Sequence, residues 1–141
     1  MITLPPTTAR RAVQAVLRGS GLIAVATGTW VVARGSAAVP DGGAVSPSAD
    51  SVLRFYATWW AGSGVLMWRL AAAPEQHPAA VRAVAAATFV GGLARILAAR
   101  HSGPPHPLFR ALTVLELVTA PALLAAQRQL APDQQESSHD R

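Results

Sequence analysis

The sequence predicts an all-α protein, a four-helix transmembrane bundle. Three observations lead to this class. Of the 141 residues, 51% are hydrophobic and only 13% are charged, about half the roughly 25% charged content of a soluble domain. Four apolar stretches follow one another, each close to the ~20 residues that a membrane-spanning helix needs. None alternates apolar and polar residues as a strand does, and their high alanine content favours helix.

The first two stretches are expected to be the first two spans. One runs from Ala12 to Ala33 and holds no charge from Gly19 onward. An amphipathic helix of a soluble bundle would carry a polar stripe, whereas this segment is apolar or weakly polar on every side. The other runs from Phe55 to Ala73, and only Arg69 interrupts it. A segment rich in glycine, alanine, proline and serine connects them.

The last two stretches are expected to form an antiparallel hairpin. The third runs from Ala79 to Ala99 and the fourth from Pro107 to Ala126, and a short turn containing Gly-Pro-Pro joins them. We expect one four-span domain over residues 1–126 and a polar, disordered C-terminal tail over residues 127–141.

All 12 basic residues are arginines, and with 7 acidic residues they give a net charge of +5. The arginines lie mostly at the ends of the apolar stretches rather than in a cluster, and no nucleic-acid-binding motif accompanies them, so we expect no nucleic-acid partner. Seven arginines fall on the side of the chain ends and four on the other side, while Arg95 lies within the third stretch. This bias predicts that both termini are cytoplasmic.

Two charged residues within the last two stretches are expected to meet. Glu116 is the only acid in any apolar stretch and lies about 13 Å beyond Pro107 along a helix, while Arg95 lies about 9 Å before His101. Because a short turn joins the two stretches into a hairpin, both depths are measured from the same membrane face. A charge inside a span costs about 2.5–3.5 kcal/mol and normally has a partner or a function.

The same half of the predicted bundle holds further polar and aromatic residues. They are Arg54 just before the second stretch, Tyr56, Trp59 and Trp60 in its first turns, Thr27 and Trp30 on the first stretch, and His101 and His106 in the last turn. We therefore predict an intramembrane pocket built around Arg54, Arg95 and Glu116. The chain has no cysteine, no convincing set of metal ligands and no phosphate-binding loop, so we predict neither a metal nor a cofactor.

The residues leave several interpretations open. The pocket could bind a lipophilic small molecule, or Glu116 could act with Arg95 as the proton donor of an isomerase or cyclase for a terpenoid or epoxide substrate. The Arg95–Glu116 pair could also be purely structural.

A further interpretation is a non-catalytic accessory subunit. Small residues recur at every fourth position of the first stretch (Ser20, Ala24, Gly28) and of the third (Ala83, Ala87, Gly91). Such faces let helices approach closely in lipid, either within one chain, between copies, or against a larger membrane complex.

An ordered set of short motifs resembles a known family. Arg54-Phe55-Tyr56, Gly91-Gly92-Leu93-Ala94-Arg95, Gly-Pro-Pro at 103–105 and Glu116 look like those of small bacterial four-helix membrane proteins grouped as a domain of unknown function, loosely similar to DoxX. The resemblance covers roughly residues 11–124. It implies four spans in the bacterial inner membrane and draws attention to Gly91 and Gly92 as ligand-binding residues beside Arg54, Arg95 and Glu116.

More distantly, the architecture is similar to emopamil-binding sterol isomerases and to membrane-bound meroterpenoid cyclases. Both place acids and aromatic residues in an intramembrane pocket. The present chain has one such acid rather than several, and likeness of fold alone does not carry an activity.

Overall fold

The computed structural model describes residues 5–130, and that part of the chain contains four α-helices and no strand. The helices are α1 (Pro6–Arg34), α2 (Pro47–Ala72), α3 (Pro78–Ser102) and α4 (Pro107–Arg128). Two short 3-10 helices, η1 (Gly35–Ala38) and η2 (Pro74–Gln76), follow α1 and α2. The predicted all-α, four-helix fold is confirmed. The first two residues of the expected C-terminal tail, Gln127 and Arg128, belong to α4. From residue 131 onward the tail lies outside the described residues.

Each helix begins at a proline, which suits the first helical position because no N–H is needed there. Ser46 Oγ accepts a hydrogen bond from Ala49 N at the start of α2, and His106 Nδ1 accepts one from Leu108 N at the start of α4, both at 3.2 Å. The Ser-Pro start explains why α2 begins at Pro47, well before the Phe55 at which its apolar pattern begins. Hydropathy detects the apolar part of a helix and not its capped end.

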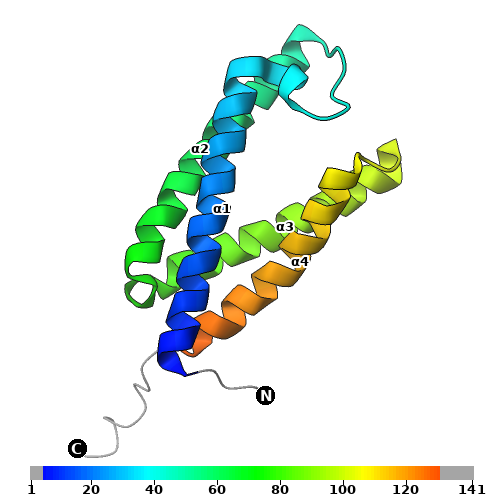
Figure 1. Cartoon of the computed structure of the whole chain (residues 1–141). Helices are drawn as coiled ribbons and strands as arrows, with labels where there is room; N and C mark the ends of the chain where they lie inside the picture. The colour runs from blue at the N-terminus through cyan, green and yellow to red at the C-terminus, as the bar shows by residue number, and fades with distance from the viewer. Residues whose placement is uncertain (1–4, 131–141) are drawn as a thin grey trace, which may run out of the picture.

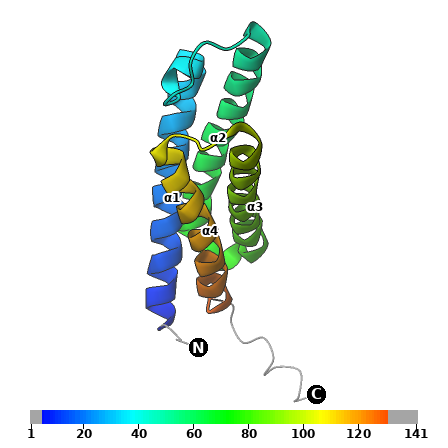
Figure 2. The same ribbon diagram turned by 90° about the vertical axis from the view of Figure 1, so that its right-hand side faces the viewer.

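The helices form two antiparallel hairpins that diverge. α1 packs along α2, and α3 packs along α4 (Figure 1), which confirms the hairpin predicted for the last two helices. The hairpins meet where α1 begins and α4 ends, called here the closed end. They separate toward the α1–α2 loop and the α3–α4 turn, called the open end (Figure 1). Figure 2 views the molecule from the side of the α3–α4 hairpin, which lies in front of α1 and α2.

The hydrophobic core lies at the closed end, where all four helices contribute to it. Its buried residues are Val13, Leu17, Met67, Leu70, Ala71, Val81, Ala85, Ala120 and Leu123. Gln127 is buried beside this core and donates a hydrogen bond from Nε2 to the carbonyl oxygen of Pro74 at 3.1 Å. This contact joins the end of α4 to η2, so the closed end fixes the hairpins relative to each other.

Glycines bring α1 and α2 into backbone contact. A Cβ at Gly21 would lie 2.8 Å from the carbonyl oxygen of Gly64, and a Cβ at Gly28 would lie 2.7 Å from that of Ala57. Gly28 belongs to the small-residue face expected on the first helix, and this face packs within the chain. The corresponding face on α3 does not, because Ala83 and Ala87 are exposed and a Cβ at Gly91 would meet nothing within 4 Å.

Three of the described helical segments are long and apolar enough to cross a membrane: α1 extended through η1, α3 and α4. α2 is not among them, and its sequence mixes apolar residues with tryptophans, a tyrosine, small polar residues and two arginines. Large apolar side chains are exposed on all four helices, an arrangement that suits hydrocarbon and not water. Examples are Leu22, Ile23, Val65, Leu66, Val90, Leu93, Val114 and Val118. These features indicate a membrane protein.

Candidate functional site

A cavity of about 640 Å³ lies between the two hairpins on the open side of the core. Its lining is mostly apolar, and Arg95 and Glu116 are the charged side chains among the described residues that line it. All four helices and the segment 38–40 contribute to the wall. The other lining residues are Ile23, Ala26, Thr27, Gly28, Trp30, Val31, Leu53, Tyr56, Ala57, Trp60, Leu108, Phe109 and Leu112.

Arg95 and Glu116 form an ion pair across the α3–α4 interface, as the hairpin and the two depths predict. Arg95 Nε donates to Glu116 Oε2 at 3.0 Å and to Oε1 at 3.2 Å. The carbon of the guanidinium lies 5.6 Å from the centre of the Phe109 ring, a cation–π contact. Both charges are partly covered, with 37% of the Arg95 side chain and 18% of the Glu116 side chain exposed.

Gly92 positions this pair without lining the cavity. It is buried, and a Cβ there would lie 2.9 Å from Leu117 Cδ2 and 3.5 Å from Glu116 Cβ. Its missing side chain therefore lets α3 approach α4 at the level of Glu116, one helical turn from Arg95. Gly91 has no such neighbour and lies away from the cavity. Gly91 and Gly92 were expected to bind ligand, but neither of them lines the cavity.

Two of the three expected aromatic residues on α2 reach the cavity. Tyr56 and Trp60 line it, and Trp60 Nε1 donates a hydrogen bond to Thr27 Oγ1 at 2.9 Å across the α1–α2 interface. Trp59 does not line it. Its side chain is 69% exposed and packs edge-on against Phe55 on the outer surface.

Arg54 is engaged outside the cavity, although it was expected to bind ligand. Its Nε donates to Asp50 Oδ2 at 2.7 Å, and its Nη1 donates to the last carbonyl groups of α1. Asp50 in turn accepts the N–H of Ser36 at 3.1 Å. The hydrogen bond from Arg54 and, after it, that from Ser36 hold the pKa of Asp50 below its ordinary value. Arg54 therefore ties the end of α1 to the start of α2.

Comparison with family profiles matches residues 12–127 to the family described as Domain of unknown function (DUF4345). The chain belongs to this family. Comparisons with curated proteins and with solved structures give no match. The DUF4345 match covers α2 and α3 completely and most of α1 and α4, and it includes both Arg95 and Glu116.

The site of this DUF4345 protein also contains residues that the sequence analysis did not name. Phe109 and Leu112 lie seven and four positions before Glu116, so helical spacing alone would have placed them on the same face of α4. Val39 and Pro40 close the cavity from the α1–α2 loop, and no local sequence signal indicates this role.

The histidines of the α3–α4 turn do not reach the cavity. His106 caps α4 through Nδ1, and His101 is exposed in the last turn of α3. Within residues 5–130, no group of three or more histidine, aspartate or glutamate side chains gathers as metal ligands would.

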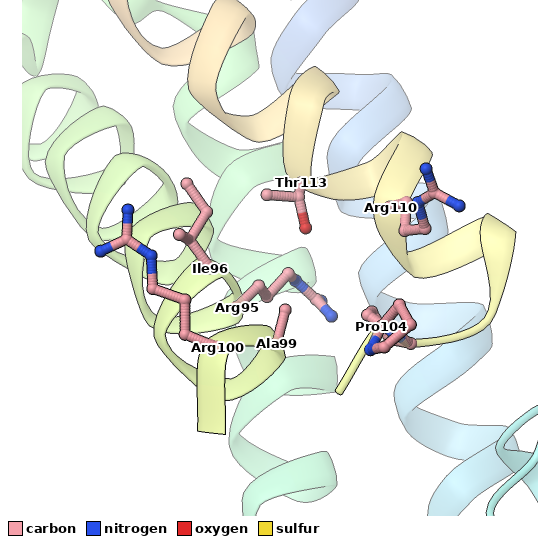
Figure 3. Close-up of a pocket in the computed structure, with 8 residues that line it drawn as sticks. Arg95, Ile96, Ala99, Arg100, Pro104, Arg110 and Thr113 are labelled. Carbon is pink, nitrogen blue, oxygen red and sulfur yellow. The ribbon is translucent and has the colours of Figure 1, made fainter. Parts of the chain in front are cut away.

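A second, smaller pocket of about 350 Å³ adjoins the α3–α4 turn (Figure 3). It is lined by Arg95, Ile96, Ala99, Arg100, Pro104, Pro105, Arg110 and Thr113. Arg95 lines both pockets, so its side chain borders both of them. In Figure 3 its guanidinium points between α3 and α4, while those of Arg100 and Arg110 point outward from the rim.

Proposed function

We propose that this DUF4345 protein crosses the bacterial inner membrane four times and binds a lipophilic small molecule in the cavity between its hairpins. The proposed topology treats α2 as the fourth span. Its 26 residues are about 39 Å long at 1.5 Å per residue, which exceeds the ~30 Å of hydrocarbon and leaves the first turn, with Asp50, outside it. α2 also packs along α1, so a crossing α1 brings α2 with it.

The orientation of the proposed topology follows from the arginines. Arg10, Arg11, Arg18, Arg69, Arg82 and Arg128 belong to the closed half, which also holds the start of α1 and the end of α4. Fewer arginines belong to the open half. Because positive residues are retained on the cytoplasmic side, the closed end is cytoplasmic in this proposal and the cavity lies in the opposite half of the membrane.

The observation that carries the binding proposal is an apolar cavity with one ion pair on its wall. Its volume of about 640 Å³ lies within the roughly 300–1,000 Å³ of small-molecule sites, which are typically apolar with a few oriented polar groups. Tyr56, Trp60 and Phe109 offer flat apolar surfaces, and the Arg95–Glu116 pair offers polar contacts. A lipophilic molecule can enter from the hydrocarbon between α1–α2 and α3–α4.

Binding receives more support than acid catalysis. Both carboxylate oxygens of Glu116 are engaged in hydrogen bonds from Arg95 Nε, and no second acidic side chain is found among the described residues that line the cavity. In the binding proposal Glu116 instead orients Arg95.

The exposed small-residue face on α3 supports a second candidate, a subunit of a larger assembly. Ala83 and Ala87 are uncovered although they share a face suited to close helix packing. In this case the intact protein co-purifies with a second membrane protein or forms oligomers, and Ala87→Phe abolishes the association.

The binding proposal is tested by filling the cavity. Ala26 lines the cavity from α1, whereas Ala15 is exposed on the same helix and lies outside both pockets. Native mass spectrometry of the full chain in mild detergent should show a lipophilic adduct on the wild type and on Ala15→Phe, and a weakened adduct on Ala26→Phe. Equal adducts on the two variants, or none on the wild type, would contradict the proposal.

A further inference from the structure

We propose that the ligand is an anionic amphiphile, whose oxyanion head group binds Arg95 beside Arg100 and Arg110 while its hydrocarbon tail occupies the 640 Å³ cavity. This inference rests on the proposed function, because it takes the cavity as the place of the tail. It adds that the ligand is negatively charged and that Arg95, Arg100 and Arg110 recognise this charge.

The first argument is the unused donor capacity of Arg95. Only its Nε makes hydrogen bonds within residues 5–130, both to Glu116, although a guanidinium also carries N–H groups on its two Nη atoms. In hydrocarbon no water satisfies such groups. Because Glu116 fixes the guanidinium on one edge, the Nη groups are held in a defined direction for an acceptor from the ligand.

The second argument is the local charge. Arg95, Arg100 and Arg110 line the smaller pocket, and Glu116 is the only carboxylate that pairs with any of them in the described part of the chain. Asp50 and Glu75, by contrast, pair with Arg54 and Arg10. The pocket region therefore has an excess of two positive charges. Carboxylates and phosphates match guanidinium groups in both charge and geometry.

The third argument is the position of the rim arginines. Arg100 lies in the last turn of α3 and Arg110 in the first turn of α4, the level at which head groups meet a membrane-spanning helix. Both residues line the pocket, and in Figure 3 their guanidinium groups point away from it on opposite sides. Rotation of these flexible side chains would bring a cation to a head group bound at Arg95, with its tail directed into the cavity.

The test compares ligands that share a tail and differ in the head group. Native mass spectrometry titrations of the full chain in a neutral detergent would use oleate, oleyl phosphate and oleyl alcohol, with inorganic phosphate as a tail-free probe. We expect the wild type to bind at least one of the two anionic ligands about tenfold more tightly than the alcohol, about 1.4 kcal/mol. The anion that binds more tightly distinguishes a carboxylate from a phosphate head group.

Matched variants separate a specific site from the overall positive charge. Arg110→Gln removes a rim cation, and Arg82→Gln removes an exposed arginine of α3 that lines neither pocket. The double variant Arg95→Gln/Glu116→Gln keeps a neutral hydrogen-bonding pair where single substitution would leave a charge unpaired. We expect the double variant to lose the preference for the anion but still bind the alcohol, Arg110→Gln to weaken the preference, and Arg82→Gln to retain it.

The outcomes distinguish this inference from the proposed function. Equal binding of oleate, oleyl phosphate and oleyl alcohol would overturn the anionic head group and leave the lipophilic cavity intact. Binding of none of the three would overturn the proposed function itself. Tight binding of inorganic phosphate alone would replace the amphiphile with a free anion.

Discussion

The close contact between α1 and α2 predicts opposite effects for two alanine substitutions on α2. A Cβ at Gly64 would lie 2.6 Å from the carbonyl oxygen of Gly21 and 2.8 Å from Val25 Cγ2, whereas a Cβ at Gly62 would meet nothing within 4 Å. A backbone oxygen of a packed helix cannot rotate away as a flexible side chain can. Gly64→Ala must therefore move α1 away from α2, while Gly62→Ala changes no contact.

The magnitude follows from two opposing contributions to the free energy of unfolding. Alanine is favoured over glycine within a helix by about 0.8–1.0 kcal/mol, and overpacking of a close contact costs about 1–3 kcal/mol. We expect Gly62→Ala to stabilise the protein by up to about 1 kcal/mol and Gly64→Ala to destabilise it by up to about 2 kcal/mol. The difference between the variants, in which helix propensity cancels, is about 1–3 kcal/mol.

The assay is unfolding of both variants and the wild type in the same detergent, followed by far-ultraviolet circular dichroism. Intrinsic fluorescence, to which all four tryptophans contribute, gives a second readout. Trp68 lies at this contact, because its Nε1 donates to the carbonyl oxygen of Arg18, one turn from Gly21. If Gly64→Ala proves as stable as Gly62→Ala, the helices do not pack through these glycines and the α1–α2 contact described above is wrong.

Three further predictions concern the open half. Arg95→Gln and Glu116→Gln should each lower the unfolding free energy by about 1–2 kcal/mol, and a double-mutant cycle should give a coupling of about 1 kcal/mol; a coupling near zero would contradict the ion pair. Because Arg54 lowers the pKa of Asp50 in the folded state, the stability from this pair is present above the ordinary pKa of 3.8 and is lost as pH falls below it. Thermal unfolding of Asp50→Asn should therefore vary less with pH in that acid range than unfolding of the wild type, and parallel pH curves would refute the assignment. Gly35→Ala should lower the free energy of unfolding by about 1–3 kcal/mol in the same assay. Gly35 has φ 60° and ψ −142°, and a Cβ there would clash with Asp50 Oδ1. Unchanged stability of this variant would show that the turn is not held as described.

The sequence predicted the Arg95–Glu116 pair because two rules sufficed. Helical rise gives the depth of each residue along its helix, and a short turn places both helices on the same depth scale. The pair then follows from the cost of leaving a charge alone in hydrocarbon. The long reach of arginine tolerates an error of a few residues in either helix boundary.

The role of Arg54 could not be predicted in the same way. Its depth at the open end suits the cavity, but the direction of its side chain depends on Asp50 and on the carbonyl groups at the end of α1. Asp50 was assigned to a loop because α2 was expected to begin at Phe55. Once Ser46 and Pro47 start the helix earlier, Asp50 and Arg54 become four positions apart on one helix and can pair.

Helical rotation also separates Trp60 from Trp59. Depth and composition treat the two alike, yet neighbouring residues differ by about 100° around a helix. Only the position of α1 decides that Trp60 donates to Thr27 and lines the cavity while Trp59 lies on the outer surface. Such choices depend on helix packing, which a single sequence specifies weakly.

The contrast between the two ends follows from what drives packing in a bilayer. In water an apolar gap between hairpins would collapse, because burial of apolar surface is favourable. In hydrocarbon this driving force is absent, and helices stay together where small residues and polar contacts allow close packing. The closed end has such contacts through Ala85, Ala120 and Gln127, whereas at the open end Phe109 and Trp60 present bulk to the space between the hairpins. An apolar cavity beside one ion pair is therefore a stable arrangement in a membrane when a hydrocarbon chain fills it, which is the reason to look for its ligand among amphiphiles.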